Sequence, residues 1–219
     1  MLGLPHVSGM KYALRLALPA IFASFAASSV AWAAPPDPAN APSDPYTTRG
    51  SVMAGLNQWL LFGGGNIAGQ LKIGRWFVAE LSHGQQLNLG RVSFALTEAE
   101  HDAGVSVAMP WTTGGGAGIQ ITPNLHVLLE LKAHRYEVRG FDRNQSTSYT
   151  SLTVGPGVFY DLYLYKGFFI QPSARWWPTV ASTYDKATFD SKAGGSYTHA
   201  RHDLTPFVNL NIGWTMTGI

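Results

Sequence analysis

Two extended segments on either side of a Thr-Pro-Asn break occur in Gly116-Ala-Gly-Ile-Gln-Ile-Thr-Pro-Asn-Leu-His-Val-Leu-Leu-Glu-Leu-Lys-Ala-His-Arg-Tyr-Glu-Val138. Beyond the break, apolar positions alternate with mostly polar ones. One side carries Val127, Leu129, Leu131 and Ala133, and the other carries Leu128, Glu130, Lys132, His134 and Tyr136. Such alternation over about ten residues is the period of a strand that separates an apolar from a polar environment. About ten residues is also the length that a tilted strand needs to cross a bilayer, so this segment predicts a membrane-spanning hairpin.

The composition narrows the class of protein. Only 13% of the 219 residues are charged, whereas a typical soluble domain carries about 25%. The formal net charge is +2 without any run of Lys or Arg, which excludes a nucleic-acid partner because phosphate binding needs a concentrated basic face. The absence of cysteine excludes disulfides, redox motifs and thiolate metal sites. The length favours a single domain.

The N-terminal residues have the composition of an export signal. Lys11 and Arg15 precede the apolar run 16–27, and Ala31-Trp-Ala33 supplies the small residues that signal peptidase requires. We therefore predict a signal peptide over residues 1–33, with Met10 as an alternative start. A membrane anchor is disfavoured because the run is shorter than the ~20 residues of a span. Five prolines between 35 and 45 predict a disordered linker over 34–49, which leaves 50–219 for the barrel.

The remaining chain predicts about eight strands. They are expected over 51–61, 67–81, 87–96, 104–121, 125–138, 149–162, 168–180 and 202–215. Alternation in the first is imperfect, so an amphipathic helix competes there, and the strand number within 50–121 stays open. The breaks at 82–86, 122–124 and 163–166 are short, whereas those at 97–103, 139–148 and 181–201 are longer or more polar. Short periplasmic turns and longer extracellular loops are typical of outer-membrane barrels.

Several segments resemble small bacterial outer-membrane barrels of the outer-membrane protein A, X and W types. Gly-x-Gly-x-Gln-Ile-Thr-Pro-Asn-Leu125 with the alternating strand after it is similar to their periplasmic hairpins. Their closing strands are similar to Gly155-Pro-Gly-Val-Phe-Tyr160, Phe169-Ile-Gln-Pro-Ser-Ala-Arg-Trp-Trp177 and Pro206-Phe-Val-Asn-Leu-Asn-Ile-Gly-Trp214. The resemblance covers roughly residues 50–216 and implies an all-β fold, a single antiparallel transmembrane up-and-down barrel. It carries over no catalytic residue. Such proteins usually finish on Phe or Trp, whereas this chain continues beyond Trp214 to Ile219.

The polar row of the opening strand is expected to face the barrel interior. Alternation on neighbouring strands adds further inward polar residues, and the full set is Glu130, Lys132, His134, Asp161, Gln171 and Arg175. Charges of both signs inside one barrel are expected to pair, because an unpaired buried ion costs several kcal/mol. We interpret the set as a network of ion pairs and hydrogen bonds that fills an eight-stranded interior. An ion- or ligand-binding site made by the same residues is the alternative.

Catalytic and metal chemistry have only weak candidates. A general base with an orienting carboxylate would need His134, or His199 with His202 and Asp203, near the outer leaflet. No serine stands at a diagnostic spacing from them, and Ser82-His83 with Glu80 is expected on the periplasmic rim. His199, His202 and Asp203 are more simply explained as solvated loop residues than as metal ligands. We therefore predict no enzyme, no metal and no cofactor.

The sequence as a whole predicts an integral protein of the bacterial outer membrane, exported through the periplasm. The expected role is structural or in surface interactions, without an open porin-like channel. Expected partners are outer-membrane lipid, the barrel-assembly machinery and an extracellular ligand or protein at the loops. Two alternatives remain: a barrel enzyme that modifies outer-leaflet lipid, and a soluble secreted barrel that binds an apolar ligand. The soluble alternative is disfavoured because its water-facing row would carry few ions.

Overall fold

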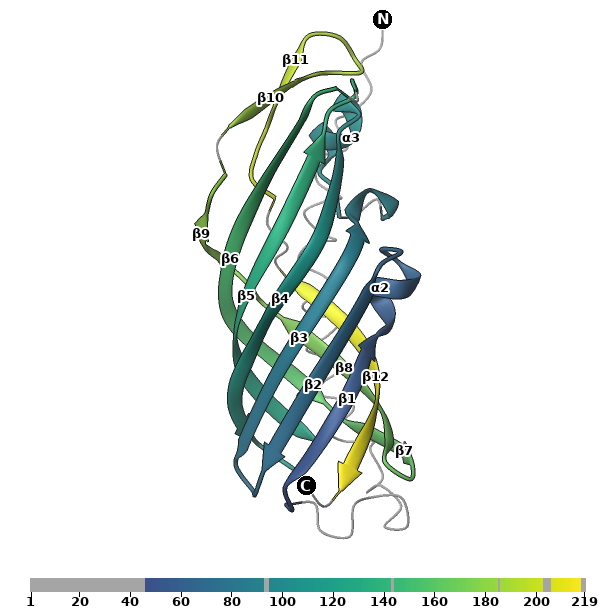
Figure 1. Ribbon diagram of the computed structural model, residues 1–219, viewed down its shortest axis with the longest axis vertical. Coiled ribbons are helices and arrows are strands. Elements are labelled where there is room, and N and C mark those ends of the chain that lie inside the picture. Colours follow the sequence, from purple (N-terminus) through teal and green to yellow (C-terminus); the bar gives the residue numbers. More distant parts are fainter. Residues whose placement is uncertain (1–45, 93–94, 143, 185, 203–205, 218–219) are drawn as a thin grey trace, which may run out of the picture. The chain divides into compact units, whose positions relative to one another are not determined.

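Antiparallel strands that close on themselves dominate the computed structural model, which describes residues 46–92, 95–142, 144–184, 186–202 and 206–217 (Figure 1). All of these residues belong to one compact unit, Pro38–Ile219. The predicted signal peptide, most of the predicted linker and Asp203 lie outside the described residues. No helix in the described ranges is long and apolar enough to cross a membrane.

Eight strands of the described chain form a closed ring. In ring order they are β1 (Arg49–Gly55), β2 (Gly65–Ile73), β3 (Phe77–Asn88), β4 (Ser106–Gln120), β5 (Leu125–Arg139), β6 (Ser146–Tyr160), β8 (Phe168–Arg175) and β12 (Phe207–Thr217). The first and last strands pair from Arg49↔Thr217 to Gly55↔Asn211, and β6 meets β8 through three pairs around Val158↔Ala174. The predicted single antiparallel barrel of about eight strands is therefore confirmed.

Shorter helices and strands lie at the two ends of the ring. They are α2 (Leu56–Leu60), the 3-10 turn η1 (Leu89–Arg91), α3 (Glu98–Ala103), β7 (Leu162–Tyr165), β9 (Thr179–Ser182), β10 (Ala187–Asp190) and β11 (Ser196–His199). One end has the short connections, namely 74–76, 121–124 and the β7–β8 hairpin, together with the start of β1 and the end of β12. The other end has α2, η1 with α3, the loop 140–145 and the long connection that contains β9, β10 and β11. The rule of short periplasmic turns assigns the first end to the periplasm and the second to the outside.

The predicted turn at 82–86 is wrong, because β3 runs straight through it. The turn between β2 and β3 lies at 74–76 instead, where Gly74 adopts a φ of 56°. The polar side chain of Ser82 was one reason to predict a turn at this position. In the structure its hydroxyl faces the barrel interior, where it accepts a hydrogen bond from Lys132 Nζ at 2.6 Å. The third predicted strand, 87–96, is replaced by the end of β3 and η1. The segment 51–61 combines both interpretations, since β1 runs directly into α2.

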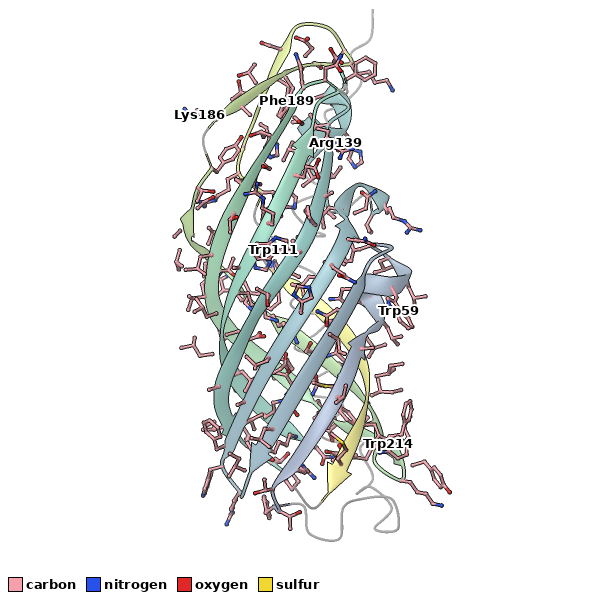
Figure 2. The ribbon with its side chains drawn as sticks, viewed as in Figure 1. Trp59, Trp111, Arg139, Lys186, Phe189 and Trp214 are labelled. Carbon is pink, nitrogen blue, oxygen red and sulfur yellow. The ribbon has the colours of Figure 1, made fainter. Side chains whose placement is uncertain are left out.

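The barrel wall is polar inside and apolar outside. On β5 the outward Leu129 and Leu131 are 61% and 50% exposed, whereas the inward Glu130 and Lys132 are 1% and 4% exposed. The outward apolar row from Leu125 to Ala133 rises about 3.4 Å per residue, or roughly 30 Å along a tilted strand, which matches an apolar band about 25 Å tall. Figure 2 shows Trp214 near the lower rim and Trp59 and Trp111 higher on the wall. A continuous apolar belt of this size is unfavourable in contact with water, so the outer surface of the wall faces lipid.

A separate apolar core lies above the polar interior, at the extracellular end. Its buried members are Phe62, Leu87, Leu89, Leu96, Ala103, Val105, Val107, Met109, Tyr136, Val138, Tyr149 and Phe189. They come from the upper parts of β3, β4, β5 and β6 and from the loops that carry η1, α3 and β10. The inward face therefore changes from polar to apolar where the strands leave the membrane. We call these loops, with their core, the cap.

Candidate functional site

The central cluster of the barrel interior contains two carboxylates and two cations. Lys132 Nζ lies 3.4 Å from Glu130 Oε1, and Arg175 lies 3.5 Å from Glu80 Oε1 and 3.6 Å from Glu130 Oε2. The indole Nε1 of Trp177 donates to Glu130 Oε2 at 3.0 Å. All four charged side chains are buried, so each carboxylate has at least one cation as its partner in a region of low dielectric constant.

A second cluster lies nearer the periplasmic end. Lys72 and Asp161 form a buried ion pair, and Gln171 Nε2 donates to the other oxygen of Asp161 at 2.9 Å. Asn211 Nδ2 in turn donates to Gln171 Oε1 at 2.9 Å, which extends the chain of hydrogen bonds to β12. Between the two clusters, the His126 ring stacks on Phe159 and its Nε2 lies 3.0 Å from Gln70 Nε2. The hydrogen bonds link strands that are far apart in the sequence and so stiffen the ring.

His134 lies apart from both carboxylate pairs. Its Nδ1 is 2.8 Å from the Thr112 hydroxyl and its Nε2 is 2.9 Å from the Thr153 hydroxyl, and the ring is only 2% exposed. Within the described residues its hydrogen-bond partners are thus two threonines and no carboxylate. A general base needs an orienting acceptor and access to a substrate proton, and this imidazole points into the barrel, away from the lipid.

The cap contains a further cluster of titratable groups. The Thr97 hydroxyl and the Glu100 side chain form a capping box at the start of α3, with Thr97 N donating to Glu100 Oε2 at 2.6 Å. The other oxygen, Oε1, faces Nδ1 of His199 at 3.4 Å and Nδ1 of His202 at 3.6 Å. The backbone N–H of His202 donates to the Tyr149 hydroxyl at 3.0 Å. Glu100 therefore connects α3 to the long loop between β8 and β12.

Ionisation of these groups reflects their surroundings in the cap. Burial alone would raise the pKa of Glu100, but its contacts with His202 and Thr97 outweigh burial and lower that pKa to about 2. Burial is the main reason that the pKa of the His199 imidazole is lowered, with the Glu100 carboxylate opposing the shift. Glu100 is thus an anion at every mild pH.

The described members of the predicted site fall into four places. Glu130, Lys132 and Arg175 belong to the central cluster, Asp161 and Gln171 to the periplasmic cluster, and His134 to neither. His202 lies in the cap. In the part of the chain that the structure describes, no group of three or more His, Asp or Glu side chains is arranged to hold a metal ion.

Sequence reasoning missed several members of the interior network. They are Arg49, Gln70, Lys72, Glu80, His126 and Trp177. The alternation of β2 already put Gln70 and Lys72 on a polar face, and His126 has the parity of Glu130 on β5. Ser82-His83 with Glu80 is not on the periplasmic rim, because β3 continues upward through these positions. Placing the turn at 74–76 would have added Glu80 to the network.

The closed antiparallel ring, the paired charges inside it and the apolar belt outside it define a transmembrane β-barrel, the class that resides in bacterial outer membranes. No family model matches this chain, and no curated protein matches it.

Solved structures similar to the chain are outer-membrane barrels. The attachment invasion locus protein Ail of Yersinia pestis, in complex with the heparin analogue sucrose octasulfate, is 13% identical over 77% of this chain and 99% of that one, with a TM-score of 0.42. A major outer membrane protein from Thermus thermophilus is 10% identical over 78% and 100%, also with a TM-score of 0.42. The N-terminal β-barrel domain of Pseudomonas aeruginosa OprF is 13% identical over 78% and 98%, with a TM-score of 0.34. At these values the likeness carries no conclusion about function, and the assignment as a transmembrane barrel rests on the strand pairing and the wall polarity of this chain.

Proposed function

We propose that this protein is a non-enzymatic outer-membrane barrel with a closed interior, whose role is structural or in interactions at the cell surface. The observation that carries the proposal is the pair of ion-paired clusters across the interior, Glu80–Arg175–Glu130–Lys132 and Lys72–Asp161. An eight-stranded ring leaves an interior only wide enough for side chains. A conducting ion would have to displace paired buried charges at two levels, which is energetically costly.

The cap supports the same proposal. Its apolar core, which includes Leu89, Met109 and Phe189, lies across the extracellular end of the polar interior. An ion that entered from outside would have to pass this mainly apolar core, where it would lose most of its hydration. The cap also presents the longest loops of the described chain, so contacts with extracellular partners are expected there.

Planar-bilayer recording tests whether the interior is closed. The full chain, reconstituted from detergent at several protein concentrations, is expected to give no large and stable conductance steps. An open porin added to the same bilayer serves as the control for insertion and sensitivity. Steps of uniform size whose frequency rises with the amount of this protein would overturn the proposal.

The lipid-modifying alternative is disfavoured by the position of His134. A lipid acyl chain lies against the outer wall, whereas the His134 ring faces inward between Thr112 and Thr153. Mass spectrometry of lipid A from cells with and without the protein is expected to show identical species. A mass change that depends on the protein and disappears in His134→Ala would restore the enzyme.

The soluble alternative requires the opposite polarity of the wall. A soluble barrel with an apolar ligand would turn Leu129 and Leu131 inward, whereas both face outward here. We expect the protein to fractionate with membranes and to need detergent for extraction.

The partners of a membrane-embedded barrel are outer-membrane lipid and the barrel-assembly machinery. We propose that this machinery recognises Trp214 and Met216, which are exposed near the end of β12.

A further inference from the structure

Arg135 is the first charged residue above the apolar outward row of β5. The row runs Leu129, Leu131, Ala133 and then Arg135, so the guanidinium starts where the apolar band ends. Its register neighbours are Trp111 on β4 and Thr150 on β6. A long cationic side chain at this level has its aliphatic stem against the hydrocarbon edge and its charged end among lipid headgroups.

The guanidinium has hydroxyl partners but no carboxylate partner among the described residues. Nη2 donates to Ser148 Oγ at 2.6 Å, and Nη1 donates weakly to Thr150 Oγ1 at 3.4 Å. The nearby Glu137 is already engaged by Arg139, whose Nε and Nη2 donate to one of its oxygens at 2.9 and 2.7 Å. The group of two arginines and one glutamate therefore keeps one uncompensated positive charge, and it lies on Arg135.

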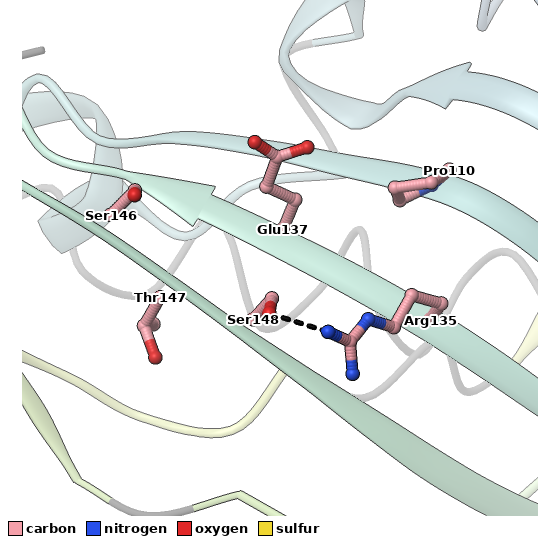
Figure 3. A pocket seen from close by; sticks show the side chains of 6 residues that line it. All are labelled: Pro110, Arg135, Glu137, Ser146, Thr147 and Ser148. Atoms are coloured by element: carbon pink, nitrogen blue, oxygen red, sulfur yellow. Dashed lines mark hydrogen bonds between the residues drawn. The ribbon is translucent and has the colours of Figure 1, made fainter.

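A polar pocket of about 270 Å³ lies beside this charge (Figure 3). Its lining residues are Pro110, Arg135, Glu137, Ser146, Thr147 and Ser148. In Figure 3 the Arg135 and Ser148 side chains point toward each other across the gap between β5 and β6. The planar guanidinium has five N–H donors, so donors remain for an anion such as a phosphate, which can accept from two of them at once.

We infer that the Arg135 pocket binds the phosphorylated headgroup of an outer-leaflet lipid. A phosphate with acyl chains below it matches the surface, because the site lies directly above the aliphatic row that ends at Ala133. A soluble phosphate compound would use the charge but not that row. The inference rests on the membrane insertion and orientation proposed above, and detergent-dependent extraction of the protein tests that insertion separately.

The test compares binding of lipid A that carries its phosphates with binding of dephosphorylated lipid A. The full chain is held in a non-ionic detergent, and each lipid is titrated in mixed micelles. We expect the phosphorylated lipid to bind about tenfold more tightly, and Arg135→Gln to abolish that preference. Arg75→Gln is the matched control, since that arginine is exposed at the opposite end of the barrel, in the turn between β2 and β3; it should keep the preference within about twofold.

Three outcomes would overturn the inference. The first is an equal affinity for the two lipids, and the second is an unchanged preference in Arg135→Gln. The third is competition by millimolar inorganic phosphate as effective as that by the lipid, which would assign the pocket to a soluble anion. Heat-modified gel mobility of each variant reports the folded barrel, and Ser148→Ala, which removes only the supporting hydroxyl, should weaken the preference partially.

Discussion

Asp161 illustrates how single residues hold the interior together. Its carboxylate receives the Lys72 ammonium on one oxygen and the Gln171 amide on the other, and all three side chains are buried. Removing one member of such a pair leaves the other charge buried without a partner, which costs more than the pair itself contributes. The energetic weight of Asp161 therefore comes mainly from the isolated Lys72 that its loss would create.

Asp161→Asn is expected to destabilise the barrel by roughly 3 kcal/mol, because it leaves Lys72 without a counterion. The double variant Lys72→Met with Asp161→Leu should recover most of that loss, since it removes both charges. Urea unfolding in lipid vesicles, followed by tryptophan fluorescence, measures both values. Glu137→Gln, at the exposed pair with Arg139, serves as the control and should cost less than about 1 kcal/mol. A double variant no more stable than Asp161→Asn would contradict the argument.

Alternation of residues predicted the side on which most interior residues lie, and it failed where a polar residue looked like a turn. Glu130 and Lys132 follow directly from the period of two on β5. Glu80 was placed on a rim because Ser82, His83 and Gln86 have turn-like composition, whereas a hydroxyl is an equally good partner for a buried lysine inside a barrel. A local pattern cannot separate these environments, since the distinction depends on a lysine about fifty residues away.

At the scale of the element, α3 shows how a helix of six residues becomes part of the cap. Thr97 and Glu100 satisfy the first backbone N–H groups through the capping box, and Gly104 ends the helix with a φ of 71°. The same Glu100 side chain then faces His199 and His202 from another loop. One residue thus stabilises the local helix and the contact between two loops.

The cap is expected to loosen at acid pH. The pKa of Glu100 is about 2 in the folded cap against 4.5 ordinarily, so its stabilising effect is complete above pH 4.5 and is lost as the pH falls toward 2. Burial also lowers the pKa of His199 from its ordinary value of 6.5. Below pH 6.5, protonation of this histidine therefore favours the state in which the cap contacts are broken, and it acts in the same direction as protonation of Glu100. Hydrogen exchange of α3 should show an opening free energy smaller by on the order of 2 kcal/mol at pH 3 than at pH 7.

Glu100→Gln separates this mechanism from a general effect of acid. The variant should exchange faster at pH 7 and should lose most of the change below pH 4.5, because it lacks the carboxylate that faces His199 and His202. The lipid-embedded part of β5 serves as the internal control and should keep its protection in both proteins. An acid response of the same size in Glu100→Gln would exclude Glu100 as the cause.

At the scale of the whole molecule, the described chain has three levels: the periplasmic turns, the lipid-facing barrel wall and the cap. The strand period, the low charge and the asymmetry of the connections were sufficient to predict a barrel of about eight strands. Strand alternation continues into the cap, as Val107 with Met109 on β4 and Tyr136 with Val138 on β5 show, but the loop residues that complete its core follow no such period. Phe62 after α2, Leu87 at the end of β3 and Phe189 on β10 enter one core only through tertiary packing. Likewise, the sequence predicted a polar loop over 181–201, whereas the structure has the end of β9 and the β10–β11 hairpin there.

The position of the bilayer makes the cost of an outward charge depend on its height. Leu129→Lys, in the middle of the outward row from Leu125 to Ala133, is expected to destabilise the barrel by roughly 2–4 kcal/mol, whereas Ala133→Lys, at the upper end of that row, should cost about 0–1 kcal/mol. Urea unfolding in vesicles of one lipid composition measures both. Ser196→Lys, at an exposed position of β11 opposite Asp190, provides the control and should be neutral within about 0.5 kcal/mol. Equal costs at all three positions would mean that the wall does not face lipid.

The pairing of β1 with β12 has a consequence for the time course of assembly. Arg49 and Thr217 are register partners, so the seam that makes the ring continuous joins the two ends of the described barrel. The ring cannot close during synthesis until β12 has been made, because β1 needs β12 as its second neighbour. Contacts of such large sequence separation form slowly, since the loop-closure entropy precedes any energetic gain. Until that seam forms, β1 and β12 each keep an edge of unpaired N–H and C=O groups, so we expect aggregation to compete with folding mainly before the ring closes.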